Sequence, residues 1–326
     1  MQSVVRMGVL GCASIAKRRV LPAMREADGI ELKAVASRDP AKARTFADEF
    51  GCDAVTGYDG LLERSDIDAV YVPLPTGLHA EWVSRALAAG KHVLSEKPLT
   101  WDHDTALDLV SQAEKAGLWL MEDYMFLHHS QHETVRKLVA DGRIGEPRVF
   151  SASFGFPPLN AADVRYHPEL GGGAFLDAGV YLIRAASYFL GSELDVIGAV
   201  LRMHPTRGVD VAGHVLLSTP SGITADLSFG FHHAYRCCYS LWGDHGKLTL
   251  DRAFTPPPAW QPVIRIESQD RAEELTLPAD HQFKNISEFF ARSILRDADY
   301  TSQAEAITHQ AQLVDQVRSK AVRITA

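Results

Sequence analysis

The chain has 326 residues, of which 46% are hydrophobic and 23% charged, as in an ordinary globular protein. This composition excludes disorder as the main state, and the length predicts about two domains. With 33 Lys and Arg against 41 Asp and Glu, the net charge of −8 disfavours a nucleic-acid binder. No uncharged apolar run approaches the roughly 20 residues of a membrane-spanning helix, and the N-terminus lacks the features of a signal peptide. Four scattered cysteines predict free thiols in a reducing cytoplasm: Cys12, Cys52, Cys237 and Cys238.

The first third of the chain alternates strand and helix patterns. Strands are predicted over residues 4–10, 31–36, 68–72, 92–95 and 119–121. Helices are predicted over residues 17–27, 40–50, 79–89 and 105–116. This alternation is typical of right-handed βαβ units and a parallel sheet. We therefore predict an N-terminal Rossmann domain, a doubly wound α/β fold, over residues 1–124.

The pattern changes after about Met125, where strands follow one another without helices between them. The extended runs are 148–156, 195–202, 210–218, 223–231, 236–242, 247–250, 263–268 and 273–277. They predict a large open, mostly antiparallel sheet. Helices are expected over 131–140, after the glycines 171–173, and over 282–295 and 302–321. Residues 125–326 thus form a predicted α+β domain for substrate binding and oligomerisation, whose last helix is a candidate for packing on the first domain.

A turn of small residues follows the first predicted strand. It reads Gly11, Cys12, Ala13, Ser14, Ile15 and Ala16, which is close to G-x-G-x-x-G/A with Ala at the middle glycine. Small residues are needed because the backbone turns sharply and a pyrophosphate lies against the amides of the following helix. A tight turn without ligand is the alternative. The position between strand and helix favours cofactor binding.

The end of the second strand predicts which dinucleotide binds. NAD enzymes usually place Asp or Glu there to hold the ribose 2′-hydroxyl, whereas this chain has Ser37 and Arg38. An acid would repel a 2′-phosphate, but a guanidinium and a hydroxyl can hydrogen-bond to it. We therefore predict NADP(H), with a solvated surface role for Arg38 as the alternative.

Glu96, Lys97 and Pro98 follow the fourth predicted strand. The strand delivers them to the carboxyl edge of the sheet, where ligands of open α/β folds bind. Because Pro98 restricts Lys97 to extended backbone, Lys97 is held more firmly than a mobile surface lysine. We predict that Glu96 and Lys97 lie beside the cofactor and that Lys97 is catalytic; a surface Glu-Lys ion pair is the alternative.

These segments together resemble the glucose-fructose oxidoreductase / inositol dehydrogenase / MocA superfamily. The resemblance rests on GCASIA, VPLPTGLHAEWVSRALAAGKHV, Glu-Lys-Pro and GGGAFLDAGVYLI, which span residues from about 8 to 185. It implies a Rossmann domain followed by an open mixed sheet, with NAD(P) and substrate between the two. It also implies cofactor contacts for Leu74, Pro75, His79 and Arg165, although His79 also fits a purely structural helix start.

Within the superfamily the chain is most similar to NADP-dependent sugar-nucleotide 3-ketoreductases of bacterial deoxysugar and antibiotic biosynthesis. The stretches MFLHHSQH and FTPPPAWQPV extend this similarity over most of the chain, while Asp123 replaces the usual Asn. The implied reaction is hydride transfer from NADPH to C3 of a TDP-linked keto-deoxysugar.

Asp177 and Tyr181 complete the predicted catalytic set. They are four residues apart on a predicted helix, so both lie on one face. Ketone reduction needs a proton for the oxygen as well as a hydride for the carbon. A phenol has a pKa of about 10, which a neighbouring ammonium lowers. We therefore predict Tyr181 as the general acid, with Lys97 polarising the carbonyl or tuning the phenol, and a packed aromatic as the alternative.

Other functions and partners remain as alternatives. A free-sugar or trans-dihydrodiol dehydrogenase of the same superfamily would use the same residues, and a non-catalytic NADP-sensing regulator would not need them. The histidines His128, His129 and His132 lack a completing carboxylate or cysteine, so no metal is predicted. An uncovered apolar sheet face is costly in water, which predicts a homodimer or homotetramer through the open sheet. No nucleic acid or membrane partner is expected.

Overall fold

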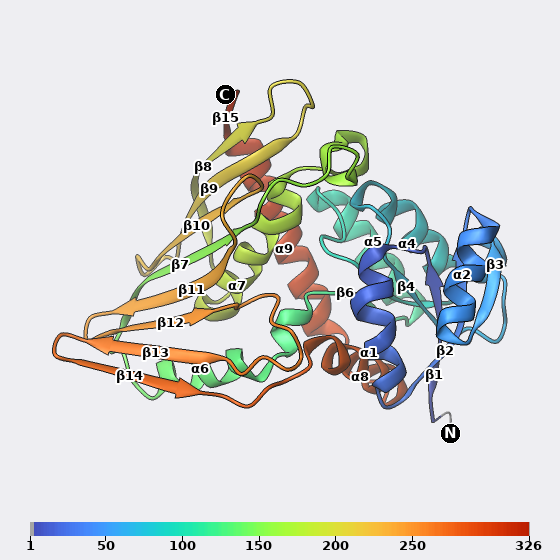
Figure 1. Ribbon diagram of the computed structural model, residues 1–326, viewed down its shortest axis with the longest axis horizontal. Helices are drawn as coiled ribbons and strands as arrows, with labels where there is room; N and C mark the ends of the chain where they lie inside the picture. Colours follow the sequence, from blue (N-terminus) through green and yellow to red (C-terminus); the bar gives the residue numbers. More distant parts are fainter. Residues whose placement is uncertain (1–2, 326) are drawn as a thin grey trace. The chain divides into compact units, whose positions relative to one another are not determined.

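The computed structural model describes residues 3–325 and divides into two compact units (Figure 1). The first unit comprises the chain up to His128 together with Gln282–Ala311. Among the described residues, the second comprises 129–281 and 312–325. The last long helix, α9 (Thr301–Lys320), therefore contributes its first half to one unit and its second half to the other. No helix among the described residues is long and apolar enough to cross a membrane.

A six-stranded parallel sheet forms the centre of the first unit. Its spatial order is β3-β2-β1-β4-β5-β6, in which β1 is flanked by β2 and β4. The strands are β1 (Val5–Leu10), β2 (Ile30–Ser37), β3 (Asp53–Thr56), β4 (Ala69–Val72), β5 (His92–Ser95) and β6 (Leu120–Glu122). This is the predicted doubly wound order, which reverses at β1 and leaves a ligand crevice at the carboxyl ends there. The sequence analysis missed β3, because a mostly exposed edge strand carries little apolar pattern.

The helices of the first unit follow the predicted positions closely, except for the short α3, which was not predicted. They are α1 (Leu21–Glu26), α2 (Pro40–Phe50), α3 (Asp59–Leu62), α4 (His79–Ala88), α5 (His103–Ala116) and α8 (Gln282–Leu295). A π-helical turn over Ala16–Val20 precedes α1. Asp39 caps α2, because its carboxylate accepts hydrogen bonds from the amides of Ala41 (2.8 Å) and Lys42 (3.3 Å).

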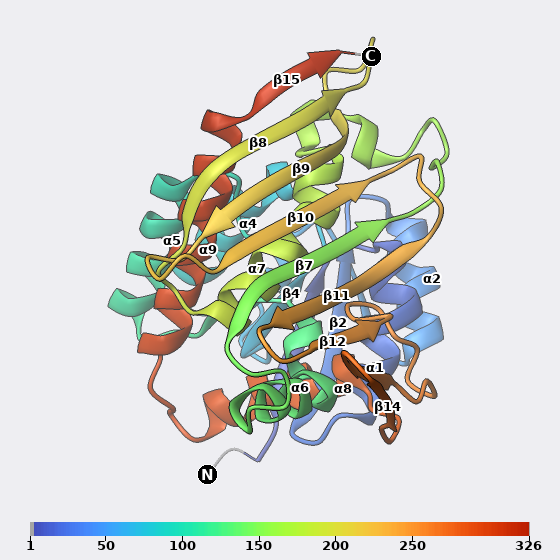
Figure 2. The same ribbon diagram turned by 90° about the vertical axis from the view of Figure 1, so that its left-hand side faces the viewer.

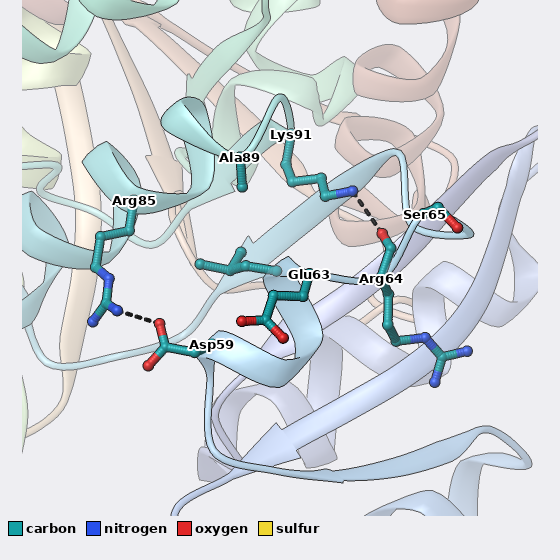
Figure 3. A pocket seen from close by; sticks show the side chains of 8 residues that line it. Asp59, Glu63, Arg64, Ser65, Arg85, Ala89 and Lys91 are labelled. Carbon is teal, nitrogen blue, oxygen red and sulfur yellow. Dashed lines mark hydrogen bonds and ion pairs between the residues drawn. The ribbon is translucent and has the colours of Figure 1, made fainter.

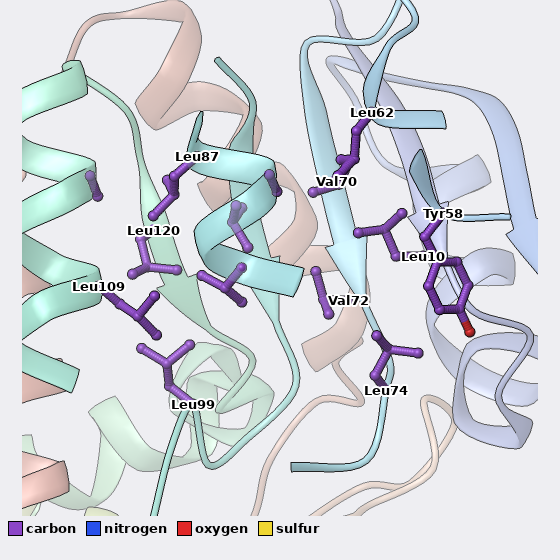
Figure 4. Packing of buried hydrophobic residues seen from close by; sticks show 14 of the residues in the cluster. Leu10, Tyr58, Leu62, Val70, Val72, Leu74, Leu87, Leu99, Leu109 and Leu120 are labelled. Carbon is purple, nitrogen blue, oxygen red and sulfur yellow. The ribbon is translucent and has the colours of Figure 1, made fainter. Parts of the chain in front are cut away.

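Aliphatic side chains between the sheet and its helices form the core of the first unit (Figure 4). Val70 and Val72 of β4 are fully buried, since a central parallel strand is covered on both faces. Helices α4 and α5 contribute Leu87 and Leu109 to the same cluster. Each such side chain contributes about 1.5–3 kcal/mol of transfer free energy. This packing holds the carboxyl ends of the central strands in place.

The second unit is built on a nine-stranded sheet, as Figure 2 shows. Its order is β14-β13-β12-β11-β7-β10-β9-β8-β15. The strands are β7 (Pro147–Gly155), β8 (Asp195–Met203), β9 (Asp210–Ser218), β10 (Thr224–Gly230), β11 (Arg236–Gly243), β12 (Lys247–Asp251), β13 (Val263–Ser268), β14 (Arg271–Thr276) and β15 (Val322–Thr325). Pairing is antiparallel except for β7 with β10 and β8 with β15. The predicted fold class, with a large and mostly antiparallel sheet, is confirmed; the strand β15 was not foreseen.

One face of this sheet is covered by α6 (Ser130–Ala140) and α7 (Val180–Leu190). The buried His132 of α6 shares a 2.9 Å hydrogen bond with the Tyr239 hydroxyl of β11. In Figure 2 the strands β8, β9, β10 and β7 lie in front of α7, with their other face toward the viewer. That face carries exposed large apolar side chains, namely Ile197, Val200, Leu216, Trp242, Val322 and Ile324.

Candidate active site

The turn after β1 has the geometry of a dinucleotide-binding turn. Gly11 has φ of +125°, and a Cβ at this position would lie 2.9 Å from a methyl carbon of Leu74. A side chain there is therefore excluded both by the backbone conformation and by the neighbouring strand end. Helix begins at Ser14, directly after the turn, so its first amides point toward the carboxyl edge of the sheet.

The end of β2 presents a hydroxyl and a guanidinium at the same edge. The Ser37 hydroxyl accepts a 3.1 Å hydrogen bond from the Asp39 amide, and Arg38 is exposed. The carboxylate of Asp39 caps α2, so it is already engaged away from the position of a ribose-binding acid. The residues present therefore fit a 2′-phosphate better than a 2′-hydroxyl.

Tyr58 also lies at this edge of the sheet, and the sequence analysis did not predict it as a site residue. It is 7% exposed, and a Cβ added at Gly11 would lie 3.8 Å from its hydroxyl. Burial raises the pKa of Tyr58, while the neighbouring Arg38 guanidinium acts in the opposite direction. An edge-to-face contact with Trp82, at 4.8 Å between ring centroids, fixes the phenol ring. A tyrosine shortly after an unrecognised edge strand offered no signal in the sequence.

The Glu-Lys-Pro segment leaves β5 beside the turn that follows β4. Glu96 accepts a 2.7 Å hydrogen bond from the hydroxyl of Tyr71 in β4. His79 is completely buried, and its two ring nitrogens lie 2.9 Å from the Pro98 carbonyl oxygen and 2.7 Å from the Leu74 carbonyl oxygen. His79 thus joins the turn after β4 to the turn after β5. These contacts position the backbone next to Lys97, which is partly exposed, and they need no bound cofactor.

Asp123, at the end of β6, lies next to this segment. Its amide donates a 2.7 Å hydrogen bond to the carbonyl oxygen of Ser95, and its side chain is 1% exposed. Neither carboxyl oxygen has a hydrogen-bond partner among residues 3–325. Burial and the charge of Glu96 raise the pKa of Asp123 well above its ordinary value, with Lys97 opposing.

In the second unit, Arg165 and Asp177 form one cluster. The Arg165 Nε donates a 2.7 Å hydrogen bond to Asp177 Oδ2, and its Nη1 lies 3.2 Å from Asp163 Oδ1. The Asp177 carboxylate raises the pKa of Arg165 above its usual value. Arg165 therefore holds Asp177 in place.

Tyr181 lies four residues beyond Asp177, as predicted, but the first turn of this helix is π-helical over Phe175–Gly179. The Tyr181 ring is 6% exposed and packs edge-to-face on Phe154, with centroids 5.6 Å apart. The second aromatic neighbour, Phe254, is completely buried and belongs to the core. π-helical turns occur frequently at functional sites.

The turn before this helix is shaped by Asp210. Oδ2 of Asp210 accepts a 2.7 Å hydrogen bond from the Phe175 amide, at the start of the helix. Burial raises the pKa of Asp210 to about 6, although hydrogen bonds from backbone amides, that of Phe175 first, lower it. Gly173 has φ of +119° and passes directly over the Asp210 carboxylate, where a Cβ has no room.

The cavity in Figure 3 lies elsewhere, before β4 and β5 rather than after them. It has a volume of about 400 Å³ and is lined by Asp59, Leu62, Glu63, Arg64, Ser65, Arg85, Ala89 and Lys91. Its cations have internal partners: Lys91 Nζ donates to the carbonyl oxygens of Arg64 (2.7 Å) and Ile67 (2.8 Å), and Arg85 pairs with Asp59. The cavity lies at the amino edge of the sheet. It is therefore separate from the carboxyl edge with the Gly11 turn, Ser37 and Arg38, which we call the dinucleotide edge.

Comparison with known proteins identifies the family. The oxidoreductase family with an NAD-binding Rossmann fold matches residues 5–124, and the GFO/IDH/MocA C-terminal domain matches residues 132–249. A dTDP-3,4-didehydro-2,6-dideoxy-alpha-D-glucose 3-reductase from Saccharopolyspora spinosa is 52% identical over 323 residues, which is 97% of each chain. The chain belongs to the GFO/IDH/MocA oxidoreductase family. The resemblance inferred from the motifs is thereby confirmed.

Further relatives of this GFO/IDH/MocA oxidoreductase include a second 3-reductase and a 3-ketoreductase of known structure. A reductase of the same name from Actinomadura kijaniata is 51% identical, over 97% of this chain and 96% of the relative. The solved structure of KijD10, a 3-ketoreductase from Actinomadura kijaniata in complex with NADP and TDP-benzene, has a TM-score of 0.98. It is 50% identical, and the match covers 99% of both chains.

The predicted site residues thus fall into two groups, one in each unit. The first unit brings Gly11, Cys12, Ser37, Arg38 and Leu74 to the dinucleotide edge, with Glu96, Lys97 and His79 around the neighbouring turns. The second unit brings Arg165, Asp177 and Tyr181 to one helix start. The meeting of Lys97 with Tyr181 over one substrate stays a prediction. No group of three or more potential metal-ligating side chains occurs in the part of the chain that the structure describes.

Proposed function

We propose that this oxidoreductase reduces the C3 keto group of a TDP-linked keto-deoxysugar with NADPH. The observation that carries the proposal is the 52% identity, over 97% of both chains, to a dTDP-3,4-didehydro-2,6-dideoxy-alpha-D-glucose 3-reductase. The NADP and TDP-benzene bound to KijD10 support both the cofactor and the nucleotide part of the substrate. A cytoplasmic place in deoxysugar and antibiotic biosynthesis fits such a substrate.

The first unit supplies the proposed cofactor site. The turn Gly11–Ala16 would receive the pyrophosphate, because a helix start offers amide donors and partial positive charge. Ser37 and Arg38 would hold the 2′-phosphate, since the carboxylate of Asp39 is engaged as a helix cap. Leu74 and Pro75 would line the nicotinamide side of the turn after β4. The cofactor supplies the hydride that becomes the C3 hydrogen.

The proton for the new hydroxyl must come from the protein. We assign it to the Tyr181 phenol, with the Lys97 ammonium stabilising the negative charge that develops on the ketone oxygen. Asp177 and Arg165 orient the start of the Tyr181 helix through their 2.7 Å hydrogen bond. In balance, one ketone, one NADPH and one proton become one secondary alcohol and one NADP⁺.

A second candidate is oxidation of a free sugar or dihydrodiol. It is favoured by a D-xylose 1-dehydrogenase (NADP(+)) of Haloferax volcanii, 35% identical over 88% of each chain. A trans-1,2-dihydrobenzene-1,2-diol dehydrogenase of Mus musculus is 31% identical over 78% of this chain. Lower identity than that of the sugar-nucleotide reductases makes this the weaker candidate.

A homo-oligomer through the open sheet is part of the proposal. Ile197, Val200, Leu216, Val322 and Ile324 expose apolar surface on β8, β9 and β15, three neighbouring strands. A second copy of the chain would remove this surface from water. Size-exclusion chromatography with light scattering gives the stoichiometry, and a charged residue at Ile197 should shift it toward the monomer.

The deciding experiment follows NADPH oxidation with a panel of keto sugars, with and without a TDP group, and adds thymidine diphosphate as inhibitor. The proposal requires turnover of the TDP-linked 3-keto sugar and competitive inhibition by thymidine diphosphate. Equal turnover of free sugars, with no effect of thymidine diphosphate, would favour the dehydrogenase instead.

A further inference from the structure

The helix that carries Asp177 and Tyr181 begins on a carboxyl group from a different element. Asp210 is the first residue of β9 and is 8% exposed. Its Oδ2 accepts the 2.7 Å hydrogen bond of the Phe175 amide, at the first residue of the π-helical turn. The first amides of a helix have no acceptor within the helix, so they need one from outside. Strand β9 supplies this acceptor from a residue 35 positions further along the chain.

The same carboxyl group also fixes the position of Gly173. A Cβ added to Gly173 would overlap Oδ1 of Asp210 and lie 3.2 Å from its Cγ, so the backbone passes directly over the carboxyl group. Asp210 therefore contacts the chain on both sides of Ala174, at Gly173 and at Phe175. We call residues 173–177, which these contacts hold, the helix start.

Three hydrogen bonds connect Gly173 to Asp177 and Arg165. The Gly173 amide donates to the carbonyl oxygen of Arg165 at 2.9 Å, and the Asp177 amide donates to the carbonyl oxygen of Gly173 at 3.2 Å. The Arg165 Nε donates to Asp177 Oδ2 at 2.7 Å. These bonds close a ring of three residues, so a shift of Gly173 moves both partners of the Arg165–Asp177 ion pair. Tyr181 follows Asp177 by four residues, about one turn further along the same helix.

We propose that Asp210 is a positioning residue of the reductase: from strand β9 it fixes the helix start and thereby sets the places of Asp177 and Tyr181. The inference rests on the proposed ketoreductase function, in which the Tyr181 phenol donates the proton. Asp210 acts through Gly173 and Phe175 and keeps the phenol within reach of the ketone oxygen. Its loss should slow the chemical step, because proton transfer requires a short and well-aligned contact.

Asp210→Ala and Asp210→Asn test the contact. Asp210→Ala removes the acceptor of the Phe175 amide, so kcat should fall by about tenfold or more, the scale on which small misplacements of catalytic groups are costly. Asp210→Asn keeps a carbonyl oxygen of the same reach and should recover most of this loss. KM for the sugar nucleotide and Kd for NADPH should change much less than kcat. If folded Asp210→Ala is less stable but keeps wild-type kcat, the role of Asp210 is purely structural and the proposal is overturned.

Asp280 provides the matched control in the same unit. Its Oδ2 accepts a 2.8 Å hydrogen bond from the amide of Ser130, the first residue of α6, so it makes the corresponding contact at a helix without a proposed catalytic residue. Asp280→Ala should lower stability and keep wild-type kcat. An equal fall of kcat in Asp280→Ala and Asp210→Ala would show a general effect of lost helix contacts and overturn the proposal.

A double-mutant cycle tests the ring of hydrogen bonds. Arg165→Ala opens the ring at its other side. The loss of kcat caused by Asp210→Ala should therefore be smaller in the Arg165→Ala background than in the wild type. Losses that multiply independently would show that Asp210 does not act through the ring, which contradicts the inference.

A measurement on the wild type does not depend on the folding of any variant. Amide hydrogen exchange, resolved to residue 175, should show a protected Phe175 amide, because its hydrogen is bonded to a buried carboxyl group. Exchange at the rate of an unprotected amide overturns the inference, even if Asp210→Ala does not fold. A protected amide in a protein that does not oxidise NADPH with the TDP-linked keto sugar contradicts the proposed function and leaves the contact of Asp210 standing.

Discussion

Alanine at position 173 would meet two obstacles at the start of the catalytic helix. Gly173 has φ of +119°, a conformation that side-chain-bearing residues rarely adopt. A Cβ there would overlap Oδ1 of Asp210 and lie 3.2 Å from its Cγ. The carboxylate cannot withdraw freely, because Oδ2 holds the Phe175 amide at 2.7 Å.

The two obstacles have separable costs. A left-handed conformation costs a non-glycine residue about 1–2 kcal/mol. Displacing Asp210 leaves a buried donor and acceptor unsatisfied, at about 1–3 kcal/mol more. We therefore expect Gly173→Ala to lower the free energy of unfolding by about 2–5 kcal/mol. Gly51→Ala is the control: φ is +69°, and no described atom lies within 4 Å of its Cβ position, so only the first cost applies.

Urea denaturation of both variants, followed by fluorescence and circular dichroism, measures the difference. In Gly173→Ala the displaced helix start should also lower kcat by about tenfold or more, since small misplacements of catalytic groups are costly. Gly51→Ala should keep wild-type kcat. If both variants lose the same free energy of unfolding, Asp210 does not dictate glycine at position 173 and the reasoning is refuted.

Three further predictions concern the site and the stability of the protein. Tyr181→Phe and Lys97→Ala should each lower kcat by roughly 100-fold or more. Tyr181→Phe should bind NADPH as tightly as the wild type in fluorescence titrations. Wild-type turnover in Tyr181→Phe would exclude Tyr181 as the proton donor. Ser37→Asp should shift preference toward NAD, because a carboxylate repels the 2′-phosphate, and an unchanged ratio of kcat/KM for NADP and NAD would contradict the cofactor assignment. Burial lowers the pKa of His132 to about 3, so the unfolded chain binds a proton below about pH 6.5 that the folded chain does not, and stability falls as pH drops through this window. At pH 5 this lowers the free energy of unfolding by about 2 kcal/mol. His132→Gln should therefore lose less stability than the wild type between pH 7 and pH 5 in urea denaturation. Identical losses in the two proteins would count against a neutral buried His132.

Local patterns were sufficient wherever adjacent residues dictate the structure. The strand-turn-helix around Gly11 and the capped start of α2 follow from small residues, an Asp-Pro pair and apolar periodicity. The positions of Lys97 after β5 and of Tyr181 on its helix follow from the same patterns. Strand β3 was missed because its pattern is polar, and β15 because four exposed residues after a long helix resemble a frayed end.

The sequence by itself determined the fold class, the dinucleotide edge and the residue types that its chemistry needs, because these depend on periodicity and on short motifs. Only the tertiary structure decided which side chains are neighbours. Tyr58 beside Arg38, Arg165 on Asp177, Asp210 under Gly173 and the buried Asp123 each join residues from different elements. Their burial and pKa shifts arise from that packing, in which water is replaced by neighbours that the local sequence does not specify.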